Sequence, residues 1–147
     1  MQARIDPYAA APAAIRAMMA LSAHAEKSGL ERSLLELVKT RASQINGCAF
    51  CLHMHARDAR AAGESETRLY LLDAWRESTL YTPRERAALA WTEALTLIAQ
   101  THAPDEDYDE LARHFSEAEQ VELTIAIVTI NAWNRIAVGF RRPHPAD

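Results

Sequence analysis

Two cysteines and a histidine stand close together in the stretch "INGCAFCLHMHAR", residues 45–57. Cys48 and Cys51 are three residues apart, His55 follows Cys51 by four, and the sequence contains no other cysteine. On a helix, residues at i and i+3 have Cα atoms about 5 Å apart, a separation that permits a disulfide. This spacing is typical of a redox dithiol.

The position of the histidines relative to Cys51 selects one of them as a base. His55 lies one turn after Cys51 on the same helix face. It can therefore take the proton of the Cys51 thiol, directly or through a water. His53 is about 200° round the helix from Cys51 and so faces elsewhere. The amide groups and the dipole at a helix N-terminus also favour a thiolate.

Two other interpretations of the cysteine pair are open on spacing alone. Both thiols can simply be buried and inert, since cysteine is among the most buried residue types. Alternatively, they can belong to a zinc site, with His55 as the third ligand and Glu36 or His102 as the fourth. The sequence has no second C-x-x-C and no H-x-x-x-H, so we expect no metal site.

Length and composition fit one globular domain over residues 1–147, with 49% apolar and 24% charged residues. The net charge is −4 and no basic stripe occurs, which argues against a nucleic-acid partner.

No segment is long and apolar enough to be expected to span a membrane. The alanine-rich N-terminus follows Asp6 and is interrupted by Pro12 and Arg16, so it does not read as a signal peptide. We therefore expect a cytoplasmic protein, where thiols are reduced and a close cysteine pair is more often catalytic or metal-binding than structural.

Helical patterns account for most of the chain, and glycine is rare, with four residues. "TPRE" at 82–85 and "SEAE" at 116–119 are capping boxes that mark two helix starts. We expect an all-α, single-domain helical bundle of about six to seven helices. The expected helices cover residues 12–27, 31–45, 48–63, 66–77, 83–100, 105–114 and a last helix that begins at 116.

The last of these helices carries the β-branched run "VELTIAIVTI", residues 121–130, which is also compatible with a strand. The capping box and the lack of a partner strand favour a helix. Its apolar residues go almost all the way round, which predicts burial on several sides and, in a small protein, a subunit interface. The tail at residues 141–145 reads as a frayed terminus or an interface arm.

The stretch Glu36–Arg60 closely resembles the core motif of the AhpD-like alkylhydroperoxidases of the carboxymuconolactone decarboxylase superfamily. The family pattern has a glutamate twelve residues before the first cysteine, then Arg-x-Ser-x-x-Asn, CxxC, and a histidine four residues after the second cysteine. "NAWNR" at 131–135 also resembles a family signature, and the resemblance covers about residues 10–140. The matching motif residues are Glu36, Arg41, Ser43, Asn46, Cys48, Cys51 and His55.

The resemblance implies an all-helical trimer or hexamer that reduces alkyl hydroperoxides through its CxxC dithiol. It implies that Cys51 attacks the peroxide, that Cys48 resolves the resulting sulfenic acid as a disulfide, and that Glu36 and His55 relay protons. It further implies a dithiol reductant, for which the family suggests a lipoyl type, and no cofactor. Alternatives are a redox-sensing or scaffold oligomer with slow turnover, and a decarboxylase of the same superfamily, which would need no cysteine pair.

This sequence departs from the family's dedicated peroxidases at the residue before the second cysteine. Those enzymes carry a histidine there, and this chain has Phe50. An apolar ring removes a proton donor and narrows the pocket. Glu36 also has a structural alternative, because Ser33-x-x-Glu36 spells a capping box. Arg41 is expected to be solvated or paired with an acid near the site.

Overall fold

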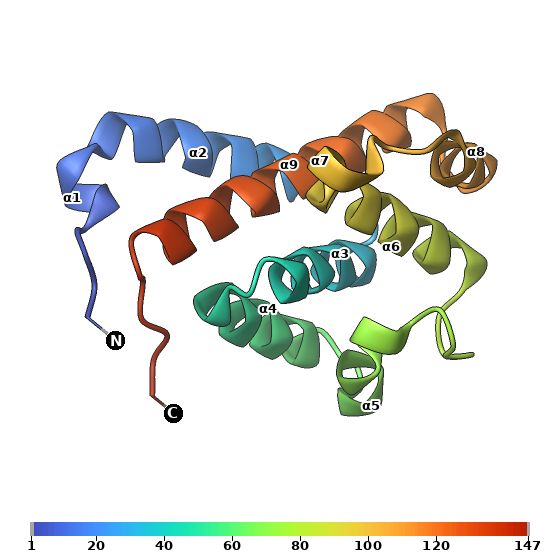
Figure 1. The fold of residues 1–147 in the computed structure, drawn as a ribbon, viewed down its shortest axis with the longest axis horizontal. Helices are drawn as coiled ribbons and strands as arrows, with labels where there is room; N and C mark the ends of the chain where they lie inside the picture. Colours follow the sequence, from blue (N-terminus) through green and yellow to red (C-terminus); the bar gives the residue numbers. More distant parts are fainter. Residues whose placement is uncertain (1, 147) are drawn as a thin grey trace.

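The computed structural model describes residues 2–146, which form helices joined by short turns (Figure 1). Within that range there are nine α-helices, one short 3-10 helix and no strand, so the all-α prediction is confirmed and the expected count was too low. The α-helices are α1 (Pro7–Ala10), α2 (Pro12–Ala25), α3 (Arg32–Ile45), α4 (Ala49–Ala61), α5 (Glu66–Tyr70), α6 (Pro83–Thr96), α7 (Ile98–Thr101), α8 (Asp105–His114) and α9 (Glu117–Gly139), and the 3-10 helix η1 spans Leu72–Ala74.

The two predicted capping boxes are present and fix the starts of α6 and α9. The Thr82 side chain accepts the backbone N–H of Glu85, whose carboxylate accepts the N–H of Thr82 in return. Ser116 and Glu119 make the same reciprocal pair at the start of α9. The run at 121–130 is therefore helical and the strand alternative is wrong. Cys48 is the N-cap of α4, so this helix begins one residue later than expected.

Two expected helices are broken in the structure, and the short helix α1 at Pro7–Ala10 was not expected; together these account for the additional helices. The helix expected at 66–77 is split into α5 and η1, because Leu72 and Trp75 turn inward to pack against Leu37 and Leu89. The helix expected at 83–100 ends at Thr96, and α7 follows after one residue. Tertiary packing thus overrides local helix periodicity at residues 66–77.

The bundle is built round α3, which packs against α4, α6 and α9 (Figure 1). Helix α2 lies beside α9, and α8 packs on α6. Buried apolar side chains from α2, α3, α6, α8 and α9 form the main core. The two chain ends lie on the same side of the molecule, where the backbone N–H of Arg4 donates to the carbonyl of Phe140 at 3.0 Å.

The expectation that no segment is long and apolar enough to span a membrane was wrong for helix α9. With 23 residues and a mean hydropathy of 1.2 in its most apolar window, it meets that criterion by length and composition alone. Its apolar character has a structural reason, since Leu123, Ile127 and Ile130 are buried against the rest of the bundle. Val121 and Val128, two turns apart, remain 62% and 50% exposed on its outer side.

Candidate functional site

Cys48 and Cys51 form a disulfide where α3 turns into α4, with their Cα atoms 5.3 Å apart. Both residues are almost fully buried, at 1% and 2% exposure. Gly47 has a φ of +64°, a left-handed conformation that glycine adopts without strain, and it reverses the chain between the two helices. The backbone N–H of Cys48 then donates to the carbonyl of Ser43 at 3.0 Å, which ties the pair to α3.

His55 and Glu36 meet across the α3–α4 interface. The Nδ1 atom of His55 lies 2.9 Å from Oε2 of Glu36, and the residues are 7% and 4% exposed. Burial raises the pKa of Glu36, but the hydrogen bond with His55 and the charge of Lys39 outweigh it and hold this pKa below its ordinary value of 4.5. Glu36 is therefore a carboxylate at neutral pH. Because a carboxylate only accepts, Nδ1 of His55 donates and Nε2 is left to exchange protons.

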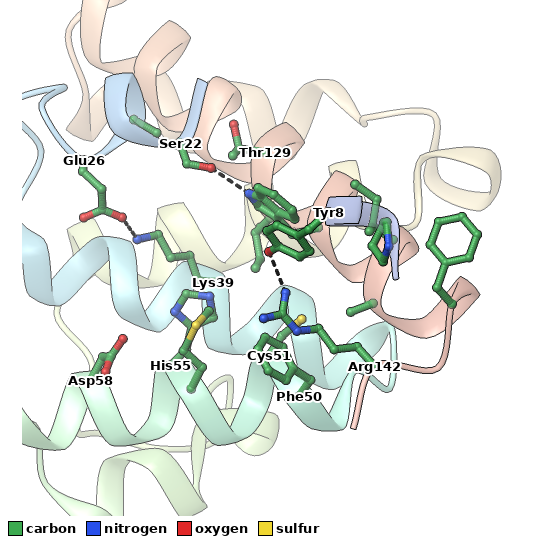
Figure 2. Close-up of a pocket in the computed structure, with 18 of the residues that line it drawn as sticks. Tyr8, Ser22, Glu26, Lys39, Phe50, Cys51, His55, Asp58, Thr129 and Arg142 are labelled. Carbon is green, nitrogen blue, oxygen red and sulfur yellow. Dashed lines mark hydrogen bonds and ion pairs between the residues drawn. The ribbon is translucent and has the colours of Figure 1, made fainter. Parts of the chain in front are cut away.

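Lys39 completes this buried cluster and was not anticipated from the sequence. Its ammonium lies 3.1 Å from Oε1 of Glu36 and also pairs with Glu26 at the end of α2. Figure 2 shows Lys39 reaching from α3 toward Glu26 above the ring of His55. The lysine is one turn after Glu36 on the same helix, so the i,i+3 spacing was the signal available in the sequence. Its single positive charge is shared between two carboxylates.

A cavity of about 700 Å³ opens beside these groups (Figure 2). Glu36, Lys39 and His55 line one part of it. Of the two cysteines, both in the described part of the chain, Cys51 lines the cavity and Cys48 does not. The remaining wall is largely apolar and includes Phe50, Met54, Ile130, Trp133, Ile136 and Phe140.

Residues from both ends of the chain form another part of the cavity wall. Tyr8 stacks on Trp133 with ring centroids 6.5 Å apart, and Trp133 donates from Nε1 to Ser22 at 2.7 Å. The guanidinium of Arg142 donates to the Tyr8 hydroxyl at 2.6 Å and lies 4.0 Å from the ring centre of Phe50. Arg142 in the tail is therefore part of the cavity wall, rather than a frayed end.

The other motif residues anchor α9 to the turn that carries the cysteines. The amide nitrogen of Asn46 donates to the side-chain oxygens of Asn131 and Asn134, at 3.0 and 2.9 Å. Asn134 in turn donates to the Ser43 hydroxyl at 3.0 Å. These hydrogen bonds connect the "NAWNR" stretch with the Arg-x-Ser-x-x-Asn lead-in. The polar residues of both motifs therefore hold the site together from outside the cavity.

Arg41, Asp58 and His53 lie near the site and do not join the cluster. Arg41 does pair with acids, Glu93 at 2.8 Å and Asp73, but these lie away from the cavity lining. Asp58 lines the cavity and lies 3.6 Å from Arg57. The ring of His53 stacks on His144, with centroids 5.7 Å apart, and does not line the cavity, as its helix position predicted.

The alternatives for Glu36 and the cysteines can be compared with this geometry. Helix α3 begins at Arg32 with Glu31 as its N-cap, so Ser33 lies inside the helix and does not form a capping box with Glu36. Across residues 2–146, no group of three or more histidine, cysteine, aspartate or glutamate side chains is arranged to hold a metal ion. The described residues therefore offer no ligand set for the zinc site considered from the sequence.

Comparison with known proteins places this chain in a family. The carboxymuconolactone decarboxylase family model matches residues 8–94. YdfG of Bacillus subtilis, an uncharacterized protein, is 44% identical over 138 residues, which make up 94% of each chain.

Solved structures show the same arrangement of helices. A protein of unknown function from Agrobacterium tumefaciens, named as a candidate antioxidant defence protein AhpD, superposes with a TM-score of 0.97. The two are 50% identical, and the match covers 99% of this chain and 100% of the other. The debrominase Bmp8 shares the fold, with a TM-score of 0.80 and 22% identity over 92% of this chain and 73% of its own. The chain belongs to the carboxymuconolactone decarboxylase family and has the AhpD-like fold.

Proposed function

We propose that this protein is a thiol-dependent peroxidase that reduces organic hydroperoxides through Cys51 and Cys48. One observation carries the proposal: Cys51 opens on the cavity one turn from His55, and Nδ1 of His55 is held by the buried carboxylate of Glu36. A thiol, a base and a group that orients the base form the arrangement of an activated nucleophile. The name of the Agrobacterium relative, which suggests antioxidant defence, agrees with this chemistry.

The first step oxidises Cys51. In the reduced protein, His55 takes the proton of the Cys51 thiol, directly or through a water, while Glu36 stabilises the imidazolium. The thiolate attacks the terminal oxygen of the hydroperoxide and the O–O bond breaks. The leaving alkoxide receives a proton from His55 and departs as an alcohol. Cys51 is left as a sulfenic acid, and the peroxide has accepted two electrons.

The second step closes the disulfide. The sulfur of Cys48 attacks the sulfur of the Cys51 sulfenic acid, and water leaves. Their Cα separation of 5.3 Å allows this bond without movement of the helix. An external dithiol then reduces the disulfide by exchange and is itself oxidised to a disulfide. A lipoyl-type dithiol is the reductant that the family suggests, and the cycle needs no further cofactor.

Phe50 distinguishes this site from that of the family's dedicated peroxidases. The ring lies in the cavity wall and under the guanidinium of Arg142, where the dedicated peroxidases have a histidine before the second cysteine. Proton transfer at Cys51 therefore depends on His55. The phenyl ring adds apolar surface where substrate would lie, which favours organic hydroperoxides over hydrogen peroxide.

We further propose that residues 1–147 act as one cytoplasmic domain that assembles into a trimer or hexamer through α9. The exposed Val121 and Val128 lie on one stripe of that helix and support a contact between copies. No nucleic acid or membrane enters the proposed cycle.

Sustained consumption of cumene hydroperoxide, measured with several dithiols, tests the function. Turnover that depends on Cys51 supports a peroxidase. One oxidation per chain without turnover by any dithiol would instead identify a redox sensor. Loss of carbon dioxide from a lactone acid, unaffected by cysteine replacement, would identify a decarboxylase.

A further inference from the structure

Arg142 places a positive charge on the cavity wall, and among the described residues no carboxylate pairs with it. Its guanidinium contacts neutral groups, namely the Tyr8 hydroxyl at 2.6 Å and the rings of Phe50 and Tyr8 at 4.0 and 4.9 Å. No carboxylate between residues 2 and 146 lies within ion-pair distance of it.

The other cations around the cavity differ from Arg142. Lys39 is already paired with Glu26 and Glu36. Arg32 is exposed at the edge of the cavity, where water screens its charge. Arg142 is half-buried and stacked against two aromatic rings (Figure 2), so its charge is less screened and its planar fork is held in place.

We propose that the hydroperoxide substrate is an amphipathic organic acid whose anionic group pairs with Arg142 while its apolar body fills the cavity. This inference rests on the proposed peroxidase function. A guanidinium binds a carboxylate through two parallel hydrogen bonds, which supplies both orientation and affinity. A cavity of about 700 Å³ is in the range that holds an organic ligand and far exceeds the needs of hydrogen peroxide.

The position of Phe50 limits how far the anion can lie from the hydroperoxide. Phe50 directly precedes Cys51, and its ring lies against Arg142. The reacting sulfur and the guanidinium therefore both belong to the cavity wall around Phe50. The walls include the aromatic rings of Trp133 and Phe140. A compact aromatic acid fits this geometry better than a long acyl chain.

The peroxide half-reaction isolates this recognition from the reductant. Pre-reduced protein is mixed, without added dithiol, with cumene hydroperoxide bearing a para-carboxylate, with the methyl ester of that acid, and with cumene hydroperoxide itself. The second-order rate constant of thiol loss is measured for each. We expect wild-type protein to react fastest with the acid. We expect Arg142→Met to slow the acid about 10- to 100-fold more than it slows the ester and the neutral peroxide, because only the acid loses a charge-assisted hydrogen-bonded pair.

Arg141→Met is the matched control, because it removes the same charge from the neighbouring exposed residue. It should leave all three rate constants at their wild-type values. Equal loss for acid and ester in Arg142→Met would overturn the inference, since it would mean that the residue only supports the cavity wall. Equal wild-type rates for acid and ester would overturn it as well.

Two further outcomes distinguish this inference from recognition of the reductant and from failure of the proposed function. The rate of disulfide reduction is also compared between anionic dihydrolipoate and neutral dihydrolipoamide. If Arg142→Met removes a preference for the anion only in this reduction step, and not in the reaction with peroxide, Arg142 recognises the reductant and the substrate inference is wrong. If folded wild-type protein reacts with none of the three peroxides, the proposed peroxidase function is wrong. Equal rates for acid and ester would overturn only the inference about Arg142 and would leave the peroxidase function standing.

Discussion

Replacing Glu36 with glutamine should slow the oxidation of Cys51 by hydroperoxide about 10- to 100-fold. The carboxylate accepts from Nδ1 of His55 at 2.9 Å and stabilises the imidazolium that forms when His55 takes the thiol proton. Glutamine keeps the shape and a carbonyl acceptor but loses the charge. A hydrogen bond to a charged group contributes about 1.5–3 kcal/mol. At about 1.4 kcal/mol for each tenfold change, this corresponds to the expected slowing.

Stopped-flow measurement of thiol loss in pre-reduced protein, with cumene hydroperoxide in excess, gives the rate constant. Glu26→Gln is the matched control. Glu26 pairs with the same lysine as Glu36 but has a side chain 47% exposed, and its described contacts do not include His55. This control should react at close to the wild-type rate. Circular dichroism and urea unfolding establish that both variants are folded.

Two results would refute this reasoning about Glu36. A folded Glu36→Gln protein that oxidises at the wild-type rate would show that the carboxylate does not assist His55. Equal slowing in Glu26→Gln and Glu36→Gln would assign the effect to the balance of charge round Lys39.

Three further predictions follow from the same geometry. His55→Ala should slow Cys51 oxidation by roughly 10² to 10⁴, as expected for a lost general base, whereas His53→Ala, outside the cavity, should not; equal effects in thiol-loss kinetics would contradict the assignment. The folded-state pKa of Glu36 lies below its ordinary value of 4.5, so its ionised form stabilises the fold above that value, and the stabilisation is lost as the pH falls through the lower folded pKa. The difference in free energy of unfolding between wild type and Glu36→Gln, from urea titrations, should therefore shrink on acidification below 4.5; a constant difference would be inconsistent with this. Light scattering at micromolar concentration should give a trimer or hexamer, and a monomer would rule out α9 as a subunit contact.

Local features of this protein could be predicted from the sequence because short-range geometry determines them. The capping boxes at Thr82 and Ser116 depend on residues three apart, and both are present. The positions of His55 and His53 relative to Cys51 follow from helix rotation, and the cavity contains the first and excludes the second. The break in the helix expected at 66–77 was missed because burial of Leu72 and Trp75, a tertiary effect, decides where α5 ends.

The parts of the site that bring distant residues together could not be predicted from spacing. Glu36 was proposed from a family resemblance, and its contact with His55 depends on how α3 packs on α4. Tyr8 and Arg142 are 134 residues apart, and neither stands in a recognisable motif. They meet because α2 and α9 run side by side and bring both chain ends to the cavity. The sequence gives no local signal for such a contact.

The unequal roles of the two cysteines are the central claim, and sulfenic acid trapping tests it most directly. Reduced Cys48→Ser and Cys51→Ser proteins are each treated with one equivalent of hydroperoxide in the presence of dimedone, and the labelled residue is identified by mass spectrometry. Cys51 lines the cavity beside His55 and Cys48 does not. We therefore expect Cys48→Ser to carry one dimedone label on Cys51, and Cys51→Ser to remain unlabelled. Label on Cys48 in Cys51→Ser, with Cys48→Ser unlabelled, would contradict the assignment and reverse the two roles.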